Sequence, residues 1–183
     1  MDLSILDLYD KLKHKAVCLD LEFTGMNKAI SLAGIYKPSN GVVKCESYLR
    51  GKDLTKENLK KSFKGSKILI TFNGNSSDIP MLEKEFPGVL PKDIISMDLY
   101  LIAKDLGLNT NLKVLENTLG IDRLNEFTKR RRIAAKLWKK YSKKNNKKAL
   151  ELLIEYNKQD TINLYPIAEK LVEIAHKKLK KKN

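Results

Sequence analysis

Strand-like segments lie early in this chain and helical segments lie late, and this order constrains the fold more than any single residue does. Apolar or β-branched runs cover residues 15–23, 29–37 and 42–50. The turn signal "KPSNG" separates the second run from the third. This spacing predicts a three-stranded antiparallel meander.

The segments that follow alternate between strand and helix. Residues 55–64 predict a short amphipathic helix, and "KILITFNG" predicts a strand that ends in a turn. The next helix is expected over about 78–86. The stretch "PKDIISMDLYLIAKDLG" predicts a further short strand and a helix that ends at Gly107. From residue 111 onward the pattern is helical, and the long final helix is expected to be interrupted at Pro166.

Length and composition favour a single domain. The 183 residues are 42% hydrophobic and contain no internal repeat or interdomain linker, so one globular domain with a substantial core is expected over residues 1–176. Residues 177–183 then form a basic C-terminal tail. The N-terminal residues 1–10 contain three acids, so neither a signal peptide nor a membrane span is expected, and the protein is predicted to be cytoplasmic.

The two cysteines indicate neither a disulfide nor a metal site. Cys18 and Cys45 lie on separate predicted strands and lack the C-x-x-C spacing of metal or redox sites. In a reducing compartment both are expected to be small core residues with no disulfide partner.

The charge distribution favours a polyanionic partner. The formal net charge is +14, and residues 127–150 hold eleven Lys or Arg and no acid. Residues 177–182 add five more basic residues. Nucleic acid is therefore the favoured partner, although Lys-rich helices are often only solvated surfaces, and this alternative stays open.

Two carboxylates interrupt an otherwise apolar strand, "AVCLDLEF". The strand period of two sends Asp20 and Glu22 to the same side, away from their apolar neighbours. Two anions beside a hydrophobic sheet stay ionised only if cations or a metal ion compensate them. A lone D-x-E is typical of ordinary surface acids, but the apolar setting of this one favours a functional site at which the two charges are compensated.

Two further acids strengthen this interpretation. Asp78 follows the strand "ILITFNG", and Asp160 lies in "EYNKQDTINLY" on the final helix. Tyr156 precedes Asp160 by four residues, so both lie on one helical face. A tyrosine at the margin of a core remains an alternative for Tyr156 taken alone. The order D-x-E, N-G-x-x-x-D and Y-x-x-x-D is nevertheless a specific signal.

These motifs resemble the DEDD (DnaQ-like) 3'-5' exonucleases, tyrosine subclass, and in particular the YprB-like ribonuclease H-like domain. The resemblance runs from "VCLDLEFTG" through "LITFNGNSSDIPML" and "SMDLYLIAKDLGL" to "AAKLW" and "EYNKQDTINL". It implies an α/β fold with a mixed five-stranded sheet, in which a three-stranded antiparallel meander and parallel strands are flanked by helices.

The resemblance also implies an activity and the residues that perform it. The activity is metal-dependent 3'-5' exonucleolytic hydrolysis of single-stranded DNA or RNA, with two divalent cations, Mg or Mn. The four acids of the metal site are Asp20, Glu22, Asp78 and Asp160, and Tyr156 orients or deprotonates the attacking water. Asp20 bridges both ions, Glu22 and Asp160 complete one site, and Asp78 supports the second, partly through water.

Substrate contacts are expected around this site. By resemblance Thr24 and Gly25 lie near the terminal nucleotide, and Asn73 and Asn75 line the path of the strand. In the basic run, the expected backbone contacts are Arg130, Arg131 and Lys136.

Two other positions affect what can be expected of substrate binding. Ser77 departs from the family, which often has an aromatic or bulky residue before the second-motif aspartate. Trp138 could stack on bases, but its spacing with Ile133, Ala134 and Leu137 predicts a core position.

Two other functions fit the same motifs. One is a non-catalytic nucleic-acid-binding module in which the acids are relics, and the other is an endonuclease or structure-specific nuclease that uses the same metal site. Intact acids argue against the first.

Overall fold

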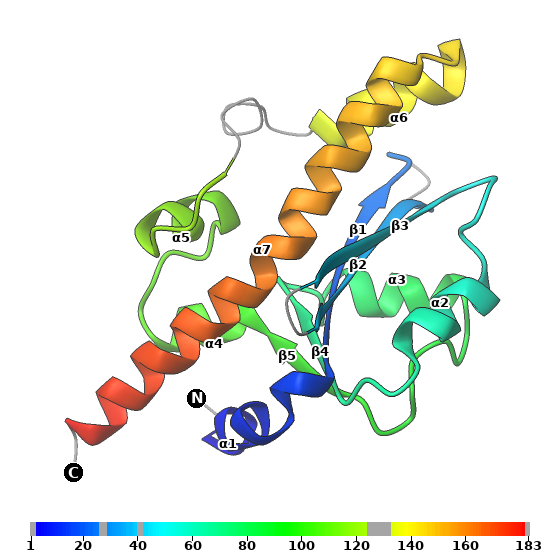
Figure 1. Ribbon diagram of the computed structural model, residues 1–183. Helices are drawn as coiled ribbons and strands as arrows, with labels where there is room; N and C mark the ends of the chain where they lie inside the picture. Colours follow the sequence, from blue (N-terminus) through cyan, green and yellow to red (C-terminus); the bar gives the residue numbers. More distant parts are fainter. Residues whose placement is uncertain (1–2, 26–28, 40–41, 124–132, 182–183) are drawn as a thin grey trace.

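A five-stranded mixed sheet forms the centre of the computed structural model, which describes residues 3–25, 29–39, 42–123 and 133–181 (Figure 1). The strand order is β3-β2-β1-β4-β5. The first three strands are antiparallel neighbours, and β4 and β5 continue the sheet parallel to β1. Their bounds are β1 (Ala16–Phe23), β2 (Ile30–Ser39), β3 (Val42–Leu49), β4 (Ile68–Thr71) and β5 (Ile95–Asp98). The predicted mixed sheet is therefore confirmed.

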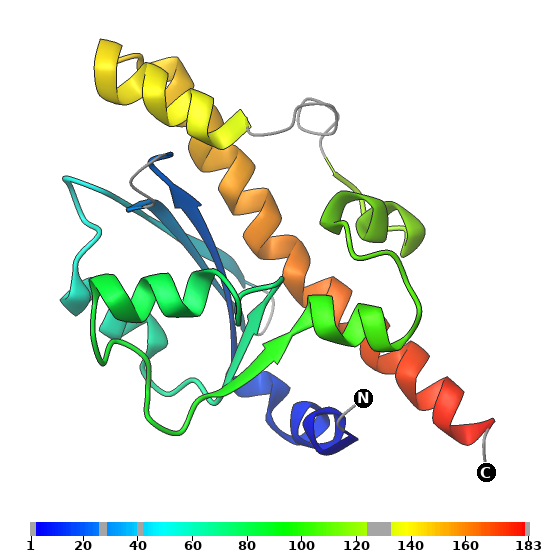
Figure 2. The ribbon, with the colours of Figure 1, turned by 180° about the vertical axis from the view of Figure 1, so that it is seen from behind.

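Helices cover both faces of the sheet because β1 buries apolar side chains on both sides. Ala16 and Cys18 join one core cluster, and Val17, Leu19 and Leu21 join another. The first cluster includes residues of α1 (Leu3–Leu12), α4 (Leu99–Asp105), α5 (Leu112–Thr118) and α7 (Lys147–Lys180). The second includes residues of α2 (Lys56–Phe63) and α3 (Asp78–Glu85), which Figure 2 shows from behind. The sheet thus separates two cores.

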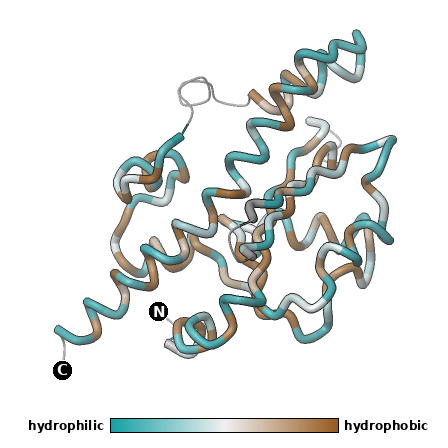
Figure 3. Tube along the Cα trace, in the orientation of Figure 1, coloured by the Kyte–Doolittle hydropathy of each residue, from teal (hydrophilic) through white to brown (hydrophobic). Residues whose placement is uncertain are grey.

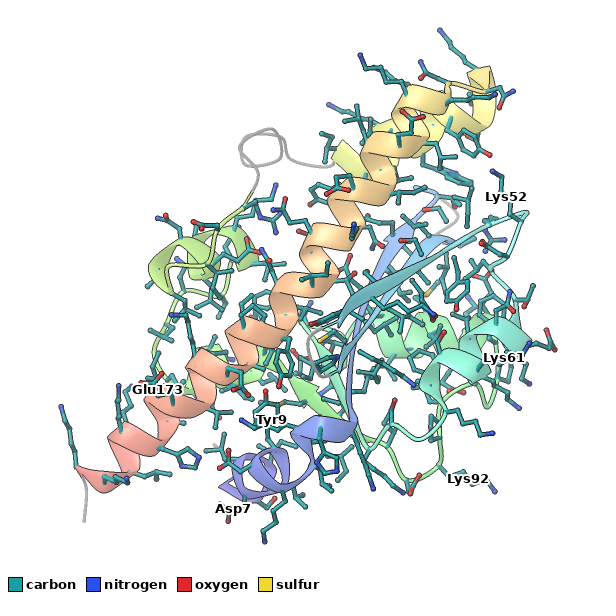
Figure 4. The ribbon with its side chains drawn as sticks, viewed as in Figure 1. Asp7, Tyr9, Lys52, Lys61, Lys92 and Glu173 are labelled. Carbon is teal, nitrogen blue, oxygen red and sulfur yellow. The ribbon has the colours of Figure 1, made fainter. Side chains whose placement is uncertain are left out.

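The N-terminal helix α1 was not predicted from the sequence. Its Leu6 and Tyr9 are buried against the same core as α7. Tyr9, labelled in Figure 4, donates a hydrogen bond from its hydroxyl to Glu169 of α7 (2.5 Å). A short 3-10 turn, η1 (Lys13–Lys15), joins this helix to β1. The helix therefore depends on tertiary contacts rather than on local propensity.

The final helix is continuous, so the predicted interruption at Pro166 is wrong. Proline lacks the N–H that would bond the carbonyl of Ile162, which costs one helical hydrogen bond. The flanking Leu164 and Ile167 are fully buried in the core. Brown and teal segments alternate along α7 in Figure 3, as in a helix that packs one face into a core. Packing on both sides of Pro166 holds the helix together.

The middle of the basic run (residues 127–150) forms α6 (Ile133–Lys144), which packs against α7. Ile133, Ala134 and Leu137 are buried, and Trp138 packs beside them, which confirms its predicted core position. Lys136 is exposed on the same helix. Arg130 and Arg131 lie outside the described residues.

Two other sequence predictions concern cysteines and membranes. Cys18 is buried, Cys45 is half-buried against the same core, and both are free thiols. Within the described ranges, every helix is too short or too polar to serve as a membrane span.

At Gly34, α7 packs tightly against the sheet. Gly34 lies on β2 directly opposite Asp20 of β1. A Cβ atom added to Gly34 would collide with Thr161 Oγ1 and Asn157 Oδ1 of α7. A residue without a side chain is therefore required for α7 to cross the sheet at this point.

We expect Gly34→Ala to destabilise the protein by about 1–3 kcal/mol, because the added methyl group overpacks the contact between β2 and α7. Gly65→Ala is the control: its added Cβ meets nothing within 4 Å, and only its φ of +78° opposes the change. That control should cost about 1 kcal/mol. Thermal unfolding of both variants measures the difference. A Gly34→Ala protein as stable as the wild type would contradict the close approach.

Candidate metal centre

Three carboxylates from two elements converge beside the crossing of β1 and α7. Asp20 and Glu22 come from β1 and Asp160 comes from α7, and one carboxylate oxygen from each lies within 4.8 Å of the others. The two strand residues share a face because they are two positions apart. Asp160 is 5% exposed, and the two strand acids are partly buried. Figure 1 shows α7 crossing β1, which brings these distant positions together.

The carboxylate of Asp20 is oriented by Asn157, which the sequence analysis missed. The side-chain amide of Asn157 donates to Asp20 Oδ2 (2.7 Å) and to the Asp20 carbonyl (3.1 Å). Asn157 is fully buried. Its position three residues before Asp160 puts both on one helical face, which was the only signal available in the sequence. Asn157 therefore links α7 to the backbone and the side chain of the same strand residue.

Burial and mutual repulsion destabilise the charged forms of these acids. Burial raises the pKa of Asp20 well above its ordinary value, and repulsion from Asp160 and Glu22 raises it further. Burial followed by repulsion from Asp160 raises the pKa of Glu22 to about 8. Burial also raises the pKa of Asp160, although Arg123 opposes this shift. A bound cation would relieve the repulsion, and oxygen donors of this kind suit Mg²⁺ or Mn²⁺.

Asp78 lies next to the cluster but outside the group of three oxygens. It is the first residue of α3, and its Oδ1 accepts a hydrogen bond from the Leu21 amide (2.9 Å). The Ser77 hydroxyl lies within hydrogen-bond distance of Asp78 Oδ2 and of the Asn73 carbonyl (3.0 Å). The charge of Asp78 raises the pKa values of Asp20 and Glu22, so it adds to the negative electrostatic potential at the cluster.

Tyr156 lies one helical turn before Asp160. Its hydroxyl and the Asp160 carboxylate are close enough for each group to shift the pKa of the other. The Nζ atom of Lys113, from α5, lies 5.3 Å from the centre of the Tyr156 ring. Burial, and then the nearby negative charge of Asp160, raise the pKa of Tyr156. The phenol is therefore protonated.

A buried arginine also contacts the cluster, and the sequence analysis did not identify it. Arg123 pairs with Asp160 through Nη2 and with Glu116 through Nε and Nη2 (2.6 and 2.8 Å). Its side chain is 4% exposed. Arg123 lies just after α5, in "GIDRL", where no periodic pattern indicates burial.

Three of the predicted substrate residues lie just after β1 or on α6. Thr24 follows β1, and its amide donates to the Ala29 carbonyl (2.9 Å). Gly25 has a φ of +95°, a value that favours glycine. Lys136 is exposed on α6, which contacts β1.

Asn73 and Asn75 belong to a turn that Asp98 holds. The Asp98 carboxylate accepts hydrogen bonds from the amides of Asn73 (2.7 Å) and Asn75 (3.1 Å). The Asn75 side chain accepts a further bond from the Ser96 hydroxyl (2.6 Å). Asp98, at the end of β5, is a buried acid that the sequence analysis also missed.

Comparison with known families agrees with the geometry. A family model described as the RNase_H superfamily matches residues 17–172. The chain belongs to the RNase H superfamily. Such domains are typically metal-dependent nucleases, and the matched region of this RNase H superfamily member contains all three clustered acids. A comparison with curated proteins gave no match.

The raised pKa of Glu22 predicts how the metal-free protein responds to pH. The folded state holds a proton up to about pH 8 that the unfolded chain releases near its ordinary value of 4.5. The folded state therefore binds more protons, and the free energy of unfolding falls as pH rises from about 5 to 8. Asp20 and Asp160 act in the same direction.

Thermal unfolding in EDTA across this pH range measures the effect. The midpoint should fall as pH rises, and Glu22→Gln should flatten the slope because it removes one titrating group. A wild-type midpoint that rises across the same range would mean that the acids are ionised without a metal.

Proposed function

We propose that this RNase H superfamily protein is a divalent-metal-dependent 3'-5' exonuclease of single-stranded DNA or RNA, of the DEDD tyrosine subclass and similar to the YprB-like domain. The observation that carries this proposal is the convergence of Asp20, Glu22 and Asp160, with Tyr156 one helical turn before Asp160 on α7. A buried group of three acids beside a positioned phenol suits phosphodiester hydrolysis better than binding alone.

The proposed metal ligands are Asp20, Glu22, Asp160 and Asp78. When bound, two Mg²⁺ or Mn²⁺ ions would supply an activated water and stabilise the leaving 3' oxygen. Asn157 fixes the carboxylate of Asp20, which we propose contacts both ions. The Leu21 amide and Ser77 occupy the carboxylate of Asp78, which favours a more indirect role through water for this residue.

Tyr156 is proposed to orient the attacking water rather than to take its proton. Its raised pKa keeps the phenol neutral, and a neutral phenol is a weak base. A hydroxyl has one donor and two acceptor lone pairs. We propose that the hydroxyl, beside Asp160, holds the attacking water through a hydrogen bond.

Substrate binding is proposed to rely on the phosphate backbone. The five exposed lysines of α6 lie on a helix that contacts the strand bearing Asp20 and Glu22. Lysines that contact phosphates bind without reading bases, so little sequence preference is expected. The proposed contacts also include Thr24, Gly25, Asn73, Asn75, Arg130, Arg131 and Lys136.

Incubation with 3'- or 5'-labelled single-stranded DNA and RNA, in Mg²⁺, Mn²⁺ or EDTA, tests the proposed function. We expect mononucleotide release from the 3' end with either metal and none in EDTA. Asp20→Asn should abolish hydrolysis and retain nucleic-acid binding, because the acids and the basic surface are different residues.

Other products would contradict specific parts of the proposal. Internal cuts would indicate an endonuclease, and binding without cleavage would indicate a non-catalytic module. Wild-type turnover by Asp20→Asn would exclude the proposed metal centre.

Tyr156→Phe should lower turnover by about 10²- to 10⁴-fold, because it removes a water-orienting hydroxyl but no metal ligand. The thermal midpoint should change little, since one hydrogen bond is worth about 1 kcal/mol. Single-turnover rates and thermal unfolding on the same variant measure both effects.

Tyr165→Phe is a matched control on the same helix. Tyr165 packs edge-on against Tyr36, with ring centres 6.4 Å apart, in the core that also contains α1. Its loss should leave the rate unchanged. A Tyr156→Phe enzyme with the wild-type rate would remove Tyr156 from the proposed mechanism and leave the acids in place.

A further inference from the structure

The buried arginine beside the metal centre has an unusual set of partners. The Arg123 guanidinium lies between Glu116 of α5 and Asp160 of α7 and bonds to both. The side chains of Arg123, Glu116 and Asp160 are 4%, 1% and 8% exposed. One cation therefore neutralises part of the charge of two buried carboxylates, one of which belongs to the acid cluster.

Neighbouring side chains hold Arg123 in position. Asn163, three residues after Asp160 on α7, donates to Glu116 Oε1 (2.8 Å) and to the Asp122 carbonyl (3.3 Å). Glu116 in turn accepts two hydrogen bonds from one edge of the guanidinium, formed by Nε and Nη2. A continuous set of contacts thus runs from Asn163 through Glu116 and Arg123 to Asp160. Both ends of this network lie on the same face of α7.

Stability alone does not explain this network. Removing charges from water is costly, and well-packed apolar side chains often stabilise a core as much as a buried ion pair does. A guanidinium fork offers something that apolar packing cannot, namely fixed donors that set the orientation of a carboxylate. The carboxylate that Arg123 orients is the one that α7 contributes to the metal centre.

We propose that Arg123 is a positioning residue, which holds Asp160 through Oδ1 and so fixes the orientation in which this carboxylate would face a metal ion. This inference rests on the proposed metal-dependent activity. Without the arginine, repulsion from Asp20 and Glu22 would favour rotation of Asp160 away from the cluster. Glu116 and Asn163 help to orient Asp160 indirectly, because they hold the guanidinium of Arg123 in place.

Arg123→Lys tests the inference because it keeps the positive charge and removes the planar fork. We expect Mn²⁺ binding, measured by calorimetry on the folded protein without substrate, to weaken about 10- to 100-fold. Turnover at a fixed Mn²⁺ concentration should fall with it, and higher Mn²⁺ should restore part of the rate. Nucleic-acid binding in EDTA should be unchanged, because Arg123 is buried away from the exposed lysines of α6.

Two further variants separate positioning from stability. Glu116→Gln leaves every proposed metal ligand intact but loosens the hold on Arg123, so it should weaken Mn²⁺ binding in the same direction. The double variant should lose less than the sum of the two single losses, because both act through one contact. Arg50→Lys is the matched control, since Arg50 pairs with Glu85 and with the Ile30 carbonyl away from the acids. It should leave Mn²⁺ affinity unchanged.

The outcomes distinguish this inference from the function on which it rests. Arg123→Lys with wild-type Mn²⁺ affinity and turnover, but a lower thermal midpoint, would overturn the positioning role and leave the metal centre standing. If Arg123→Lys does not fold, wild-type Mn²⁺ affinity in Glu116→Gln would overturn it equally. A wild-type protein that binds no Mn²⁺ would instead overturn the proposed metal-dependent function and this inference with it.

Discussion

The contact between α7 and the sheet at Gly34 determines where every residue of the acid cluster lies. Gly34 is paired with Asp20, and Asn157 and Thr161 of α7 occupy the space that a side chain there would fill. Only at this separation can Asn157 reach the backbone and the carboxylate of Asp20 together. The same approach brings Asp160 to the two strand acids. The absence of one side chain thus sets the geometry of the site.

Close approach of acids creates an electrostatic cost that the fold offsets only in part. Burial and repulsion raise the pKa values of Asp20 and Glu22. Arg123 lowers the cost at Asp160, and Lys113 does so at Glu22. The remaining negative charge is the physical reason that a cation is favoured at this site. Both fixed cations come from residues 113–123.

Much of the arrangement followed from local periodicity. The period of two along β1 predicted that Asp20 and Glu22 share a side, and the four-residue spacing on α7 predicted that Tyr156 and Asp160 share a face. The order of strand-like and turn-like segments predicted the meander, whereas the mixed five-stranded sheet that the structure contains was implied by the family resemblance. The two spacings and the meander depend on residues close together in the chain, so the sequence by itself determines them.

Tertiary structure alone decided which faces meet. Asp20 and Asn157 are 137 positions apart, and Arg123 and Asp160 are 37 apart, so no local spacing relates them. The burial of Arg123 and Glu116 depends on α5 packing beside α7, and the continuity of α7 past Pro166 depends on the core around it. Periodicity in a sequence predicts on which face of its own helix or strand a side chain lies. The side chain that it meets depends on how distant elements pack, and here that packing depends on the space left open at Gly34.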